Sequence, residues 1–157
     1  MARIYAVTFE NVAVTVASDL FDIAPADDKP CIIHAIYLSQ STELGDAAEE
    51  QLRIKIIRGF ATVGSGGGTF TPVPLNEHAP ASGATCRIND TTIAVVGGGV
   101  TDVLWAESFN LRSGWQFLPT PEFRPVVKQT STRLVVQLVA APTDSVTMNG
   151  TLIMEEI

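Results

Sequence analysis

The amino-acid sequence predicts an all-β protein, folded as one antiparallel sandwich or jelly roll of about eight to ten strands. Apolar and β-branched residues come in short runs separated by turn residues, which is the pattern of strands. No long helix and no repeat of fixed period is indicated. The chain has 157 residues, of which 46% are hydrophobic. Residues 1–157 are therefore predicted to form a single domain with a substantial core.

The N-terminal third predicts strands joined by polar turns. At 51–60, leucine and isoleucine residues alternate with Arg53 and Lys55, as in an antiparallel strand with one face in solvent. The acidic stretch at 41–50 is interpreted as a loop, in which a short helical turn at 46–50 is left open. The predicted strands are residues 3–9, 12–16 with a continuation through 19–23, 31–38 and 51–60, with a turn at 25–30.

A polar, glycine-rich segment from Gly59 to Asp90 interrupts these strands. It carries Gly-Ser-Gly-Gly-Gly-Thr at 64–69 and three later prolines. A structureless connection of about thirty residues is uncommon in a compact domain and is usually functional or disordered. We interpret residues 61–90 as an extended arm that contacts a partner and returns to the sheet at 89–92.

Short strands are predicted again after this loop. Three prolines, at positions 119, 121 and 125, are expected to keep the residues between them extended and to remove backbone donors there. The predicted strands of this part are residues 91–96, 102–111, 115–118, 132–140 and 146–155. Together with the strands of the N-terminal third, they give the about eight to ten strands expected of a sandwich.

Charge and hydropathy exclude two classes of partner. The formal net charge is −7 and the ten basic residues are scattered, whereas sequence-independent binding to nucleic acid needs clustered Lys and Arg. No apolar run approaches the roughly 20 residues of a transmembrane helix. The N-terminal residues 1–6 lack the layout of a secretion signal, so we expect a protein that is made in, and stays in, the cytosol of the producing cell.

The sequence shows no catalytic or metal-binding constellation. The glycines at 64–69 suggest a phosphate loop, but no lysine follows them, and the prolines oppose the helix that such a loop requires. Zinc sites use three or four nitrogen or sulfur ligands, whereas this chain has two histidines. His34 lies in an apolar run and is interpreted as a core or interface residue. We therefore predict no enzyme activity, no cofactor and no metal.

The two cysteines and the two tryptophans also have structural interpretations. Cys31 and Cys86 are expected to be free thiols in a cytosolic protein, although the sequence does not decide whether they pair. Trp105 and Trp115 fit core or interface anchors better than sugar-stacking platforms, because aromatic residues make up only 7% of the chain.

A set of strand and turn segments, spread over nearly the whole chain, carries a resemblance to a known family. The segments are residues 5–9 with 12–15, 19–23, 29–34, 50–54, 58–59 with 64–67, 89–92, 109–114 with 119–122, and 148–152. Together they resemble small structural proteins encoded among the head genes of tailed bacteriophages, of the decoration or cement type. None of these segments contains a catalytic motif.

The resemblance implies a jelly-roll sandwich that assembles as homotrimers on the outside of an icosahedral head. There it would bridge subunits of the major capsid protein against the pressure of packaged DNA, as a virion protein made in the host cytoplasm. Loops and arms make many contacts in such proteins, which points here to residues 64–89 and 119–125. The expected contact residues are Gly64, Gly66, Gly67, Phe70, Pro72, Pro74, His78, Pro119, Pro121 and Phe123.

Two other functions remain open from the sequence. One is a carbohydrate- or receptor-binding module of a phage tail tip or fibre, in which Trp105 or Trp115 would stack on a sugar ring. The other is a small β-barrel enzyme. The sequence does not decide which symmetry position on the head, or which partner surface, the protein would occupy.

Overall fold

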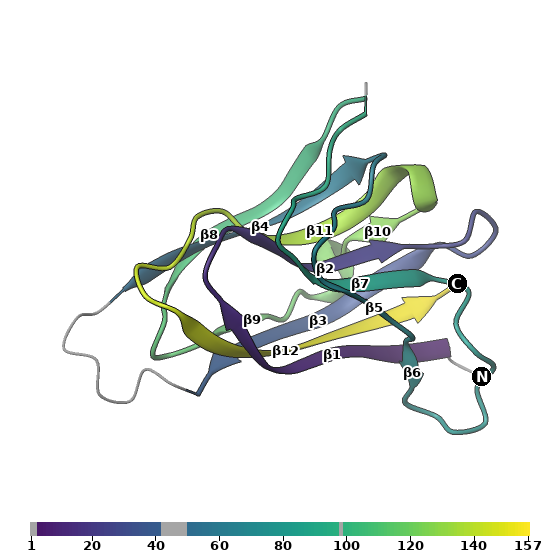
Figure 1. The fold of residues 1–157 in the computed structure, drawn as a ribbon. Coiled ribbons are helices and arrows are strands. Elements are labelled where there is room, and N and C mark those ends of the chain that lie inside the picture. The colour runs from purple at the N-terminus through teal and green to yellow at the C-terminus, as the bar shows by residue number, and fades with distance from the viewer. Residues whose placement is uncertain (1–2, 42–49, 98) are drawn as a thin grey trace.

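The computed structural model describes residues 3–41, 50–97 and 99–157, which form two stacked antiparallel sheets (Figure 1). The strands are β1 (Arg3–Val14), β2 (Ser18–Ala24), β3 (Cys31–Gln40), β4 (Gln51–Phe60), β5 (Gly68–Phe70), β6 (Val73–Pro74), β7 (Thr85–Asp90), β8 (Asp102–Asn110), β9 (Trp115–Phe117), β10 (Val126–Val127), β11 (Arg133–Leu138) and β12 (Val146–Glu156). Two 3₁₀ turns, η1 (Pro121–Phe123) and η2 (Thr130–Thr132), complete the described elements. The predicted all-β sandwich is confirmed.

The strand order is that of a jelly roll. Sheet A runs β10-β3-β12-β1-β6, with β9 also paired to β3, and sheet B runs β5-β7-β2-β11-β4-β8. Strands β9 and β10 follow one another along the same edge of β3, so together they act as the fourth strand of sheet A. The sets β1-β12-β3-β9/β10 and β2-β11-β4-β8 then alternate along the chain as a jelly roll requires.

Residues 61–101 are an insertion in this winding, between β4 and β8. The insertion extends both sheets at the edge opposite β8 and β10: β7 and β5 add to β2, and β6 adds to β1. Figure 1 shows β6 close to the start of β1 and the end of β12, and the pairing of Arg3 with Glu156 confirms that these two strand ends are neighbours. The long polar segment therefore belongs to the sandwich.

The core lies between the two sheets. Along β12 every second side chain from Val146 to Glu156 is buried, as expected of a strand with one face in solvent. Gly150 interrupts this row because a Cβ there would overlap the ring of Phe9, which packs 5.2 Å from the ring of Phe21. The largest fully buried side chains are Tyr5, Leu20, Phe21, Ile23, Ile33, Ile36, Ile54, Ile56, Leu134, Leu138, Met148 and Leu152.

The structure differs from several expectations at the level of elements. The predicted strands at 3–9 and 12–16 form the single strand β1, with a bulge at Asn11, whose φ is 51°. The predicted strand at 91–96 is wrong, since these residues form isolated bridges only. The described residues form twelve strands rather than about eight to ten, because several strands have two or three residues. Most of the helical turn left open at 46–50 lies outside the described residues.

The stretch at 119–125 was predicted to be extended throughout, and this is also wrong. It contains η1, with Pro121 at its first position. The fixed φ of proline suits the start of a helical turn as well as it suits an extended chain. Proline content alone therefore could not distinguish the two conformations.

Candidate partner-binding surface

The first of the two predicted contact segments is hydrogen-bonded to its own domain. Ser65 and Thr92 exchange two backbone hydrogen bonds of 2.9 Å, and Thr62 and Val95 exchange two more. We call residues 61–67 together with 91–97 the cover ribbon. It lies on the outer face of sheet B, where Ile57, Phe60, Ala94 and Val135 form a small second core with Val96 at its margin.

A buried polar layer fastens the cover ribbon to the sheet. The carboxylate of Asp90 accepts hydrogen bonds from Nε and Nη2 of Arg87, at 2.8 and 2.7 Å, and from the backbone N–H of Gly67 at 3.0 Å. The carboxylate of Asp19 accepts from the backbone N–H of Ala94 at 2.6 Å and from the side chain of Gln137 at 3.1 Å. Each aspartate therefore ties one strand of the ribbon to sheet B.

A third aspartate of this layer is held mainly by charge. Asp22 lies 3.3 Å from Nε of Arg133, and both residues are buried. Burial raises the pKa of Asp22 to about 7, and the nearby Asp19 and Asp90 act in the same direction, while Arg133 and Arg87 oppose them. Burial is also the main cause that raises the pKa of Asp19. The polar layer thus contains carboxylates that are costly to ionise.

Close backbone approach explains two of the glycines that were predicted as contacts. A Cβ on Gly67 would overlap the carbonyl oxygen of Ile88, and one on Gly64 would overlap the carbonyl oxygen of Thr92. Gly66 has a φ of +92° and packs against Thr91. These positions are required for the ribbon to lie on its own sheet, which is a different role from contact with a partner.

The second half of the insertion is fastened to the C-terminal strand. The Tyr5 hydroxyl donates to the carbonyl of Pro80 at 2.9 Å. Oε1 of Glu156 accepts from the hydroxyl of Ser82 and from the backbone N–H groups of Gly83 and Ala84. Pairing of β6 with Tyr5 and Ala6 adds a further attachment. Residues 75–78 form a tip at which four consecutive side chains are exposed.

The remaining predicted contacts of this first segment are distributed unevenly. Phe70 is partly buried and packs against the core, and Pro72 is buried. Pro74 is partly buried in β6, whereas His78 is exposed at the tip. The structure therefore does not gather these residues into one surface.

The second predicted segment lies in an open position. It splits the fourth strand of sheet A, because residues 118–125 leave the sheet after β9 and return to it at β10. Pro119 is partly buried, while Pro121 is exposed, and the ring of Phe123 is 73% exposed. This excursion faces the edge of sheet B that β8 forms.

A groove of about 390 Å³ lies between this excursion and β8. We call it the edge groove, and its lining is Arg58, Leu104, Trp105, Phe117, Phe123, Arg124, Pro125 and Val126. Exposed large apolar side chains are frequent on the elements around it, namely Val103, Trp105, Leu118, Phe123 and Val126. The edge groove is thus an apolar depression at an open side of the sandwich.

Trp105 is held in place at the wall of the edge groove although 44% of it is exposed. Its ring packs edge-on against Phe117, with centroids 5.1 Å apart. Oε2 of Glu107 accepts hydrogen bonds from the indole N–H of Trp105 at 2.9 Å and from that of Trp115 at 3.0 Å. These two bonds lower the pKa of Glu107. The predicted anchor roles are confirmed for Trp115, which is buried, while Trp105 is half exposed.

Sequence reasoning named Phe123 as a contact and included Arg124 and Pro125 within the predicted segment 119–125. Trp105 was interpreted as a core or interface anchor, and Arg58 and the other lining residues of the edge groove were missed. The lining comes from β4, β8, β9 and residues 123–126, which are far apart in sequence. One signal was present, since Arg58 is a charged residue at a position where the alternation of residues 52, 54 and 56 predicts an apolar one. Nothing in the sequence pairs it with residue 124.

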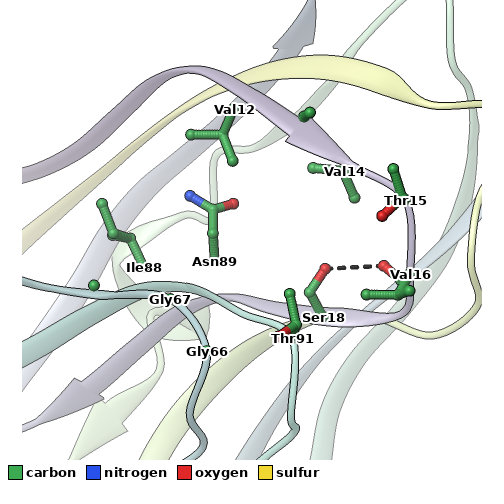
Figure 2. Close-up of a pocket in the computed structure, with 12 residues that line it drawn as sticks. Val12, Val14, Thr15, Val16, Ser18, Gly66, Gly67, Ile88, Asn89 and Thr91 are labelled. Carbon is green, nitrogen blue, oxygen red and sulfur yellow. Dashed lines mark hydrogen bonds between the residues drawn. The ribbon is translucent and has the colours of Figure 1, made fainter.

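A second cavity, of about 290 Å³, lies between the cover ribbon and the turn that joins β1 to β2. Figure 2 shows the side chain of Asn89 pointing into it between Val12 and Ser18, with Gly66 and Gly67 along one rim. Asn89 has a φ of 54°, and its amide atoms are buried with no hydrogen bond to any residue that the structure describes. The lining has hydroxyl, amide and apolar groups without a charged side chain in the described part of the chain.

The remaining candidate residues lie apart from both cavities. Nε2 of His34 lies 2.8 Å from Oε2 of Glu155 on the outer face of sheet A. Cys31 and Cys86 are buried free thiols, and burial raises the pKa of Cys31 to about 12 and that of Cys86 further. Among the described residues no group of three His, Cys, Asp or Glu is placed to hold a metal ion. No described helix is long and apolar enough to cross a membrane.

Comparison with known proteins identifies no relative from which a function could be transferred. No family model, no curated protein and no solved structure matches the chain. The strand order and the edge groove are therefore the observations from which a function has to be inferred.

Proposed function

We propose that this protein is a head decoration protein of a tailed bacteriophage, which attaches to the outside of the head through the edge groove and bridges subunits of the major capsid protein. The edge groove carries the proposal, because large apolar side chains are concentrated there at an open side of the sandwich. Such patches mark interaction sites on proteins that otherwise bury their apolar groups. The jelly-roll order and the resemblance in strand and turn segments support the same class.

The groove has the composition of an energetic centre of an interface. Aromatic residues and arginine dominate the binding energy of many protein interfaces, and here Trp105, Phe117 and Phe123 are accompanied by Arg58 and Arg124. Glu107 and Phe117 already fix the ring of Trp105. A ring that is ordered before binding loses less conformational entropy on binding.

Attachment to a capsid would be multivalent. We expect homotrimers, so that each particle presents several edge grooves to a repeating lattice of capsid subunits, and weak individual contacts then add up to firm attachment. The net charge of −7 is compatible with a position on the outer surface, away from DNA.

Co-sedimentation of the purified protein with emptied phage heads tests the proposal. The wild type is expected to bind and Phe123→Ser to lose about tenfold or more in affinity, because an exposed aromatic anchor is removed. The matched control is Leu75→Ser, which removes an apolar side chain that is 61% exposed on the first predicted segment. Failure of the wild type to bind heads at any salt concentration would overturn the proposal.

A carbohydrate- or receptor-binding function is the second candidate, and the exposure of Trp105 favours it. An aromatic ring fixed beside a groove suits the face of a sugar. Binding on a glycan array that is lost in Trp105→Ala would support this function. Binding to heads without any glycan signal would exclude it in favour of the capsid proposal.

A further inference from the structure

We infer that the edge groove binds an extended segment of its partner, in which an apolar side chain is next to a carboxylate side chain. The inference rests on the proposed function, since the capsid protein would supply this segment. It is carried by three features of the groove: an unpaired strand edge, an aromatic wall and a pair of arginines.

The strand edge is that of β8. This nine-residue strand pairs with β4 through one of its edges, from Asn110 opposite Gln51 to Asp102 opposite Arg58. It is the last strand of sheet B, and no strand of the described chain pairs with its other edge. An extended peptide can add to such an edge through main-chain hydrogen bonds.

Acidic side chains on an edge strand can oppose the pairing of an added strand, but the two carboxylates of β8 are bound within the protein. Of the two carboxylates on β8, that of Glu107 is bonded to the indoles of Trp105 and Trp115. That of Asp102 lies 3.4 Å from Arg58. Both groups are therefore directed to partners within the domain.

The aromatic wall would receive the apolar side chain. Trp105 stands on β8 itself, and Phe117 and Phe123 approach from the split strand of sheet A. Leu104 and Trp105 of β8 line this space, so we expect a residue of a strand paired to the free edge of β8 to place its side chain there. Alternate side chains of an added strand point to the same side.

The arginines select the charge of the neighbouring residue. Within the described lining the charged residues are Arg58 and Arg124, both basic in a protein of net charge −7. Arg58 donates to the carbonyl of Val126 at 3.0 Å and faces Asp102. Nε of Arg124 is buried and makes no hydrogen bond within the described structure. Glu122, which is outside the lining, feels the charge of Arg124.

Arg124 is therefore the residue that would receive the partner's carboxylate. A planar guanidinium can donate two parallel hydrogen bonds to one carboxylate, and Arg124 lines the groove as a partly buried residue. A sugar could stack on Trp105 but would bring no negative charge to Arg124. An acidic, partly apolar peptide satisfies the strand edge, the rings and the arginine together.

Selection from a random heptapeptide library displayed on yeast tests this inference without a capsid. Peptides enriched on the wild-type protein are expected to share Asp or Glu next to an aliphatic or aromatic residue. A synthetic peptide of the enriched sequence should bind Arg124→Gln at least tenfold more weakly than the wild type. The matched control Lys128→Gln, which removes an exposed cation near the same segment, should bind as the wild type does. Equal melting temperatures would show that both variants are folded.

Nuclear magnetic resonance with the same synthetic peptide locates the binding site. Backbone amide shifts are expected along β8, together with a shift of the indole N–H of Trp105. Enriched peptides without acidic residues, binding that Arg124→Gln leaves unchanged, shifts that avoid β8, or the absence of enrichment would each overturn the inference.

The outcomes separate this inference from the proposed function. Acidic peptides that bind in the groove of a protein that does not bind heads would support the inference and overturn the capsid role. Attachment to heads that Phe123→Ser weakens and Arg124→Gln leaves unchanged would support the proposed function and overturn the inference.

Discussion

Two segments of this protein share a composition and differ in what they contact. The segments 64–89 and 119–125 are both rich in glycine or proline, and both were predicted to touch a partner. The first is hydrogen-bonded to both sheets of its own domain. The second leaves the edge of sheet A and places Phe123 beside an apolar groove.

This difference between the two segments shows that glycine and proline predict the conformation of the backbone but not whether the segment is exposed to solvent. Gly64 and Gly67 are needed because the chain passes very close to its own backbone. Pro121 begins a short turn that holds its neighbours outward. An internal cover and an external contact can therefore look alike in sequence, and substitutions in the two segments should separate them.

The largest expected effect comes from removing the carboxylate beneath the cover ribbon. Asp90→Ala should lower the free energy of unfolding by about 3–5 kcal/mol, because the variant leaves Arg87 unpaired and the N–H of Gly67 without its acceptor. Asp144→Ala, at an exposed turn, should change it by less than about 0.5 kcal/mol. Urea denaturation measures both. Equal losses in the two variants would mean that the ribbon does not depend on this anchor.

A neighbouring pair of glycines gives a sharper test of close approach. Gly67→Ala should cost about 1–3 kcal/mol, since the new Cβ overlaps the carbonyl of Ile88 and the ribbon must shift. Gly68→Ala should be nearly neutral, because nothing lies within 4 Å of a Cβ at that position. Thermal unfolding of both variants decides the matter. If Gly68→Ala were the worse variant, the packing of the ribbon described above would be incorrect.

The buried polar layer should also make stability depend on pH. The pKa of Asp22 in the folded protein is about 7, above the ordinary value for aspartate, so folding favours the protonated form. Its contribution is present below about pH 4 and is lost as the pH rises through 7, with a slope of at most about 1.4 kcal/mol per pH unit. Denaturation curves between pH 5 and pH 8 measure this slope, which Asp22→Asn should reduce and Asp144→Asn should leave unchanged. An unchanged slope in Asp22→Asn would refute the assignment.

The sequence was sufficient to predict the β-sandwich but not the strands and bridges at its edges. Alternation at 51–60 identified β4, and a run rich in apolar and β-branched residues at 146–155 identified β12. Each of these strands has one face in the core. Residues 91–96 are as apolar as a strand, yet they make only isolated bridges, because Ala94 and Val96 pack on the outer face of sheet B instead. A local sequence pattern can predict that a residue is buried, but it does not show against which layer of the sandwich the residue packs.

The candidate site was predictable only in part for a similar reason. Phe123 was selected from its place in a proline-rich loop, and Trp105 was weighed as an anchor. Arg58 and Arg124 meet because β4 and the split strand of sheet A lie at the same open side of the jelly roll. The proximity of these two arginines depends on the strand order, which cannot be predicted from a short-range pattern of residues.

The smallest expected effect on stability belongs to the second segment. Phe123→Ser should change the free energy of unfolding by less than about 0.5 kcal/mol, because a ring that is 73% exposed loses little packing when it is removed. Phe70→Ser, in the first segment, should cost more, since that ring is partly buried and packs against the main core. Thermal unfolding of the two variants compares them directly. An exposed aromatic ring that contributes little to folding is available for binding, so a large loss in Phe123→Ser would make the edge of sheet A a structural element instead of a contact.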